Sequence, residues 1–180
     1  MTVPRPFRPL RPRLYDYDGT HTEVLEVLAI ELTGSASGIP PEVWNEVVEL
    51  ARDPEGRIAA GATWLFRRWV EEGHVPTGRA LERLSEHLGD VADKWARLHL
   101  VQALPSIDLP RELAPAWADF CRRGLAADAP FLRAWSVNAF VHLARIDPAL
   151  ASEARAALES ALSDPKASVR ARARKILEGS

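Results

Sequence analysis

The sequence predicts an all-helical fold built from repeated helix pairs, and three observations support this prediction. An arginine recurs at near-constant spacing, 40, 36 and 37 residues apart, at Arg57, Arg97, Arg133 and Arg170. A large apolar residue follows each arginine by seven positions, at Trp64, Leu104, Phe140 and Leu177. Short turns separate segments with helical periodicity, and no segment has the pattern of a strand. Self-similarity at a fixed period indicates one helix–turn–helix unit stacked on copies of itself.

The length and composition are those of a globular protein that folds in water. A chain of 180 residues is long enough for one domain, and its 47% hydrophobic and 27% charged residues are ordinary. No apolar run approaches the ~18 residues of a membrane helix, and MTVPRPFRPLRPR lacks the apolar centre of a secretory signal. The expected compartment is therefore the cytoplasm. Cys121 is the only cysteine, which excludes an internal disulfide and a cysteine-rich zinc site, and we expect it to be a small, partly buried apolar group.

Charge is distributed unevenly along the chain. The formal charge of −2 is the sum of +2 in residues 1–19, +4 in residues 166–180 and −8 between them. A nucleic-acid-binding protein of this size usually has a basic face through its body, which this chain lacks. The basic ends are consistent with a solvated arm and a polar cap on the last helix.

The first 19 residues are expected to form an extended arm, because Pro4, Pro6, Pro9 and Pro12 disfavour helix. Residues 20–180 are expected to form a helical repeat domain. Its first helix is expected to begin at Thr20, where T-x-x-E makes a capping-box pattern ahead of VLEVLAIEL. The segment GSASGIPP, residues 34–41, ends that helix.

Four helix pairs are expected to follow the first helix. A short turn divides each pair, at Asp53-Pro54, Gly89-Asp90, Ala127-Asp128 and Asp164-Pro165. The predicted ranges are 41–52 with 55–72, 77–88 with 91–104, 110–126 with 130–145, and 148–162 with 166–178.

The last pair, ALASEARAALESALSDPKASVRARARKILEG, has a first helix ending in L-S-D-P and then the pattern V-R-A-x-A-x-x-x-L. In this pattern the chain resembles the HEAT-repeat family, α-solenoids built from antiparallel helix pairs. ADAPFLRAWSVNAFVHLARID and DKWARLHLVQALPSID match more loosely, and RDPEGRIAAGATWLF matches least. The resemblance covers roughly residues 40–180 and implies a right-handed alpha-alpha superhelix, a HEAT-like solenoid. Such a degenerate pattern specifies a fold better than a function.

The resemblance also implies a structural role for the repeated arginines. In this family an aspartate near the turn and the repeated arginine commonly hydrogen-bond between neighbouring repeats. The corresponding residues here are Asp53/Arg57, Asp93/Arg97, Asp128/Arg133 and Asp164/Arg170.

Two positions of each second helix depart from the apolar pattern, at two and five residues after the repeated arginine. They hold Ala59 and Ala62, His99 and Gln102, Trp135 and Asn138, and Arg172 and Lys175, and one further turn adds His142. Spacings of three and four residues place each set on one line of its helix. In solenoids that resemble this chain, the second helices line the concave surface that binds partners. We therefore expect His99, Gln102, Trp135, Asn138, His142, Arg172 and Lys175 to bind a partner.

Trp135 has two interpretations. An exposed Trp beside amide and imidazole groups has the composition of an interaction hot spot. Alternatively, the register is shifted by one residue and Trp135 is part of the core. The other tryptophans are expected to be buried, and Trp69, near a helix end, could reach the groove.

No catalytic residues, cofactor site or metal site are predicted. DYDGT at 16–20 matches the D-x-D-G-T signature of haloacid-dehalogenase phosphotransferases, but the preceding RPFRPLRPRLY cannot form the central strand that this chemistry needs. Asp16, Asp18 and Gly19 are instead expected to form a turn. The five histidines show no i, i+4 pair that suggests a metal site.

The leading hypothesis is a non-catalytic scaffold or adaptor module that binds a protein or peptide partner, with no membrane association. The alternative is a nucleic-acid-binding or DNA-repair protein, since a group of alkylpurine DNA glycosylases is also built from HEAT-like repeats. Those enzymes have aromatic residues and an Asp on a basic concave face, whereas the predicted stripe lacks a carboxylate. A third hypothesis, suggested only by the fold, is a regulatory partner of an enzyme, as among the chromophore lyases with similar repeats.

Overall fold

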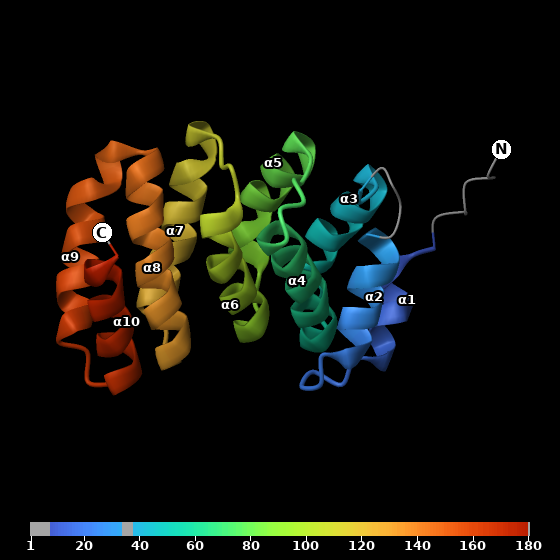
Figure 1. The fold of residues 1–180 in the computed structure, drawn as a ribbon, viewed down its shortest axis with the longest axis horizontal. Helices are drawn as coiled ribbons and strands as arrows, with labels where there is room; N and C mark the ends of the chain where they lie inside the picture. Colours follow the sequence, from blue (N-terminus) through green and yellow to red (C-terminus); the bar gives the residue numbers. More distant parts are fainter. Residues whose placement is uncertain (1–7, 34–37, 180) are drawn as a thin grey trace.

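The computed structural model describes residues 8–33 and 38–179, and every regular element in these ranges is helical (Figure 1). The helices are α1 Leu10–Arg13, α2 Glu23–Thr33, α3 Pro41–Leu50, α4 Gly56–Glu71, α5 Gly78–His87, α6 Lys94–Ala103, α7 Ala114–Leu125, α8 Pro130–Ile146, α9 Ala151–Leu162 and α10 Ala167–Glu178. The predicted all-α class is confirmed. Each of the eight paired helices lies inside its predicted range, except that α8 continues one residue further.

The helices follow one another along the long axis of the molecule from α1 to α8, and α9 and α10 lie together at the far end, with α9 outermost (Figure 1). One row consists of α4, α6, α8 and α10, each packed on the next, and α3, α5 and α7 pack in the same way in a second row. The contacts of α3 with α4 and of α7 with α8 join the two rows. Helix α9 packs on both α8 and α10. The first row contains all four second helices, so it contains the whole predicted stripe.

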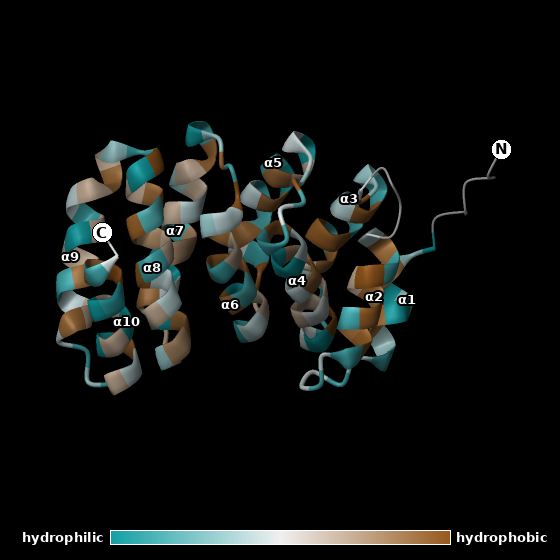
Figure 2. Cartoon of the chain, viewed as in Figure 1, coloured by the Kyte–Doolittle hydropathy of each residue, from teal (hydrophilic) through white to brown (hydrophobic). Residues whose placement is uncertain are grey.

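Local sequence signals fix where several of these helices begin. The Asp93 Oδ1 atom accepts hydrogen bonds from the backbone N–H groups of Trp95 and Ala96, both at 2.9 Å, and Thr77 caps α5 through Ala80. These side chains satisfy amide groups that have no partner within the helix. Hydrophobic and hydrophilic residues lie side by side on most helices (Figure 2), as amphipathic packing requires.

An aromatic cluster forms the centre of the core. The Trp44 ring meets Phe66 and Trp69 edge-on, with centroid separations of 5.6 and 5.4 Å, and all three side chains are buried. The buried Trp117 donates its indole N–H to the Ser85 hydroxyl oxygen at 3.0 Å. Large aromatics thus link α3 to α4 and α5 to α7. The expectation that Trp44 and Trp117 are core residues is confirmed.

Two expectations about tryptophan are wrong. Trp69 is fully buried and cannot reach a groove, because it packs against Trp44. Trp95 is 42% exposed, because it lies in the first turn of α6, where it stacks flat on Phe131 at 4.9 Å. Trp64, at 7% exposure, is buried as expected.

The N-terminal segment departs most from the sequence-based expectation. Residues 1–7 lie outside the described residues, but residues 10–13 form α1 instead of an extended arm. Leu10 and Leu14 are 1% and 0% exposed, and the Leu10 N–H donates to Glu46 Oε1 at 2.7 Å. Pro12 is tolerated because every N–H of a single helical turn lacks an intrahelical acceptor. Two buried leucines outweigh the propensity of a proline-rich sequence.

The first repeat helix begins at Glu23 and not at Thr20. Asp18 Oδ1 instead accepts the backbone N–H groups of Thr20 and His21, at 2.8 and 2.9 Å, and Gly19 has a φ of 91°. The DYDGT segment is therefore the predicted turn, confirmed in the structure.

The resemblance implies hydrogen bonds between an aspartate near the turn and the repeated arginine of a neighbouring repeat. Among the described residues, one such pair is present. Arg133 donates to both carboxylate oxygens of Asp164 in the next pair, at 2.9 and 3.0 Å. Arg57 bonds to Glu55 and the Tyr15 carbonyl, and Arg170 to the Asp164 carbonyl. The side chain of Asp93 caps α6, and a buried Arg97 nitrogen has no hydrogen-bond partner among the described residues.

Candidate functional site

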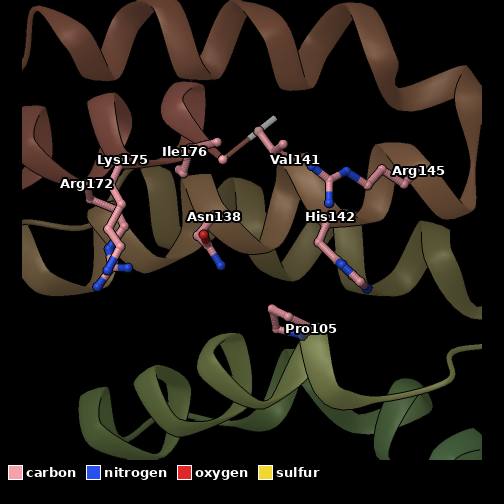
Figure 3. Close-up of a pocket in the computed structure, with 9 residues that line it drawn as sticks. Pro105, Asn138, Val141, His142, Arg145, Arg172, Lys175 and Ile176 are labelled. Atoms are coloured by element: carbon pink, nitrogen blue, oxygen red, sulfur yellow. The ribbon is translucent and has the colours of Figure 1, made fainter.

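A pocket of about 250 Å³ lies between α8 and α10, opposite the turn that follows α6 (Figure 3). Its lining residues are Pro105, Asn138, Val141, His142, Arg145, Arg172, Lys175, Ile176 and Gly179. Four of the seven predicted stripe residues, Asn138, His142, Arg172 and Lys175, are among them. The structure therefore brings together the part of the stripe that lies on the last two second helices.

The repeat period explains why these four side chains converge. Arg172 follows Trp135 by 37 residues, and Lys175 follows Asn138 by 37, the same separation as between Arg133 and Arg170. Helices α8 and α10 pack on each other, and the pocket brings these positions of the two helices together. Asn138 and Lys175 are thus placed on opposite sides of one pocket.

Trp135 is half-buried, with one side packed on the main core and the other covered by Arg172. The Arg172 guanidinium carbon lies 3.8 Å from the Trp135 ring centroid. Cation–π contact of this kind is worth about 0.5–2 kcal/mol and fixes the orientation of the guanidinium group. Trp135 therefore packs against the core on one side, and its outer face contacts a charged group of the pocket.

The pocket is cationic. Arg145, Arg172 and Lys175 line it, no lining residue is acidic, and none of these three cations is ion-paired with a carboxylate of the described residues. The partial burial of His142 lowers its pKa below the ordinary value, and the neighbouring Arg145 lowers it further. The imidazole is consequently neutral at pH 7 and can gain a proton when an anion approaches.

At the other end of the row of second helices, the arginines of α4 lie near carboxylates. Arg68 pairs with Glu72 at 2.6 Å, and Arg67 lies 3.7 Å from Glu71. Arg67 also donates to the Gln102 side-chain oxygen at 2.5 Å, which ties α4 to α6. At the α4 end of the row both arginines therefore lie near a glutamate, whereas the three cations of the pocket are not ion-paired with a carboxylate of the described residues.

The prediction that His99 faces a groove is wrong. His99 is 8% exposed and lies between α4 and α6, with Nδ1 at 3.1 Å from the Ala60 carbonyl oxygen and 3.2 Å from Thr63 Oγ1. Ala59 and Ala62, at the equivalent positions of α4, are buried as well. Burial, with Arg67 nearby, lowers the pKa of His99 from 6.5 to about 3.

His99 is expected to make the protein sensitive to mild acid. Its pKa is lower in the folded state, so the unfolded chain binds more protons between about pH 6.5 and 3, and stability is lost as the pH falls below 6.5. We expect the free energy of unfolding to fall by about 2 kcal/mol between pH 7 and 5 from this group. Urea denaturation at both pH values measures this fall in the free energy of unfolding. His99→Gln should show a smaller loss, and an equal loss in both proteins contradicts the assignment.

Several pocket residues are outside the predicted stripe. Arg145 follows His142 by three residues, so continuing the same helical line would have identified it. Pro105 comes from the 3-10 turn Leu104–Ser106, and no periodic pattern in α8 or α10 indicates its proximity. Gln102, which bonds to Arg67, does not line this pocket.

The described residues offer little for other chemistries. In residues 8–33 and 38–179, no three His, Cys, Asp or Glu side chains gather as a metal site requires, and no helix is long and apolar enough to cross a membrane. Cys121 is fully buried, and burial raises the pKa of its thiol to about 12, which leaves it unreactive.

Comparison of the chain with family models, with curated proteins and with solved structures finds no match. The function must therefore be argued from the geometry of the site alone.

Proposed function

We propose that the chain is a short HEAT-like α-solenoid and that its second helices form a partner-binding face. The near-constant period, the two rows of helices packed in chain order and the Arg133–Asp164 contact between neighbouring pairs support this architecture. Repeats of this kind commonly use the inner row of helices as an extended binding surface.

The protein acts as a non-catalytic interaction module that binds a protein or peptide partner on this face. The observation that carries the proposal is the pocket between α8 and α10, where Asn138, His142, Arg172 and Lys175 converge and the cations have no carboxylate partner among the described residues. A concave site with a supported arginine beside an aromatic ring has the composition of an interface hot spot.

Arg172→Glu tests the proposal better than a change at Trp135, because Trp135 is part of the core and its replacement also affects folding. Arg174→Glu is the matched control: it makes the same charge change on α10, at an exposed position that does not line the pocket. Nuclease-treated host lysate is passed over wild type and both variants. We expect a protein that binds wild type and Arg174→Glu but not Arg172→Glu.

The captured protein is then purified and titrated directly. Loss of a central charged contact typically costs about 2–5 kcal/mol, so we expect at least about ten-fold weaker binding to Arg172→Glu. Equal affinity for all three proteins, with unchanged melting temperatures, excludes this face as the binding site.

Nucleic-acid binding remains the second candidate, favoured by the three unpaired cations of the pocket. Capture that disappears after nuclease treatment, together with direct binding of duplex DNA that weakens steeply with salt, would support it.

A further inference from the structure

The pocket has both a cationic and an apolar part. Pro105, Val141 and Ile176 provide apolar surface, and Arg145, Arg172 and Lys175 provide charge (Figure 3). Its volume of about 250 Å³ is below the ~300–1,000 Å³ of sites that hold whole cofactors or drug-sized ligands. The pocket therefore has room for one or two side chains of a larger partner.

The arrangement of donors suits a carboxylate. The Arg172 guanidinium carbon lies 3.8 Å from the Trp135 ring centroid, and the side chain lines the pocket, where its N–H groups can donate to an anion. Paired N–H groups of this kind match the two oxygens of a carboxylate. The Asn138 amide and the Lys175 ammonium lie one helical turn further along the same pocket and add donors.

The apolar surface of the pocket favours an acidic side chain over a free inorganic anion. The methylene groups of a glutamate can contact Val141 and Ile176 while its carboxylate meets the cations. A nucleic-acid backbone requires a continuous row of cations to follow its phosphates. That row is interrupted here, because Arg67 lies near Glu71 and Arg68 pairs with Glu72 at the other end of the face.

We infer that the pocket between α8 and α10 binds the carboxylate side chains of an acidic, glutamate-containing segment of a protein partner, with Arg172 and Lys175 as the principal contacts. This inference rests on the proposed function and specifies the chemistry of the partner. Asn138 adds a neutral hydrogen bond, and Arg145 closes the cationic side of the pocket.

Binding of such a segment is expected to be coupled to protonation of His142. The charged groups around this imidazole are Arg145 on its own helix and Arg172 and Lys175 on α10, while the turn after α6 contributes the uncharged Pro105. Burial and the neighbouring Arg145 disfavour a protonated His142, and a bound carboxylate offsets the effect of Arg145. A proton is therefore taken up on binding, and affinity rises as the pH falls.

The test measures fluorescence anisotropy of a fluorescein-labelled peptide of alternating glutamate and serine, titrated with the full chain. The same peptide with glutamine in place of glutamate is the ligand control, and Arg174→Gln is the protein control. We expect Arg172→Gln and Lys175→Gln each to bind about ten-fold more weakly than wild type, and Arg174→Gln to bind normally. Near-equal binding of the glutamine peptide, or equal weakening by all three variants, overturns the inference.

Two further ligands separate carboxylate from phosphate recognition. The same peptide with phosphoserine in place of glutamate, and a single-stranded oligonucleotide, are titrated under identical conditions. We expect both to bind more weakly than the glutamate peptide. Binding of either that is about ten-fold tighter overturns the assignment of a carboxylate ligand.

The pH dependence provides an independent readout. Glutamate side chains remain ionised at about pH 6, so a gain in affinity there reports on the protein and not on the peptide. We expect wild type to bind about three-fold tighter at about pH 6 than at about pH 8, and His142→Gln to lose this difference. An unchanged pH response in His142→Gln excludes His142 from the site.

Failure of this inference is distinguishable from failure of the proposed function. If Arg172→Glu loses a captured protein but no glutamate peptide binds, the face binds a partner of different chemistry. If the glutamate peptide binds wild type and Arg172→Gln equally, the pocket does not hold the carboxylate.

Discussion

Replacement of Leu14 by alanine is expected to lower the free energy of unfolding by about 3 kcal/mol. The Leu14 side chain is fully buried, and it approaches Gly61 of α4 so closely that an added Cβ atom there would lie 3.1 Å from Leu14 Cδ2. Removing the leucine leaves a cavity that these neighbours cannot fill, and the lost contacts add to the lost burial. Urea denaturation followed by circular dichroism measures the change.

Ile30→Ala is the matched control for Leu14→Ala. Ile30 is 72% exposed on α2, so its truncation is expected to change stability by less than about 0.5 kcal/mol. If the two variants lose similar stability, the N-terminal segment is not part of the core and its buried position in the structure is incorrect.

Gly124→Ala is expected to destabilise the protein by about 3 kcal/mol, despite the higher helix propensity of alanine. A Cβ atom at position 124 would lie 2.0 Å from Ser136 Oγ and 3.0 Å from Ser136 Cβ, across the contact between α7 and α8. Both helices are well packed, so relieving this overlap requires them to separate. The loss is measured from urea denaturation midpoints at constant m-value.

A second variant shows whether the overlap is the cause. Ser136→Ala removes a buried hydroxyl that has no hydrogen-bond partner among the described residues, so alone it should cost little. Combined with Gly124→Ala, it should restore more than half of the lost stability. Gly78→Ala, where no atom lies within 4 Å of the added Cβ, serves as the control and should not destabilise. Destabilisation by Gly124→Ala that Ser136→Ala leaves unchanged contradicts this explanation.

The structure brings four of the seven predicted stripe residues together in one pocket, and the reason differs between residues. Asn138, His142, Arg172 and Lys175 line one pocket because α8 and α10 pack on each other, and the 37-residue spacing in the sequence already aligns Asn138 with Lys175. His99 lies two residues after its repeated arginine, as Arg172 does, yet it is buried. The difference lies in the neighbouring helix α4, where His99 lies within hydrogen-bond distance of the Ala60 carbonyl oxygen and Thr63 Oγ1.

The sequence alone determined the helical class, the ranges of the eight paired helices and the line of polar residues on α8 and α10. These features depend on spacing within one helix or on one repeat period, both of which are local properties of the chain. The tertiary structure decided that Leu10 and Leu14 join the core, that His99 is enclosed and that Arg172 covers Trp135. Each of these depends on the size of side chains contributed by another element, and the burial gained there outweighs local preference.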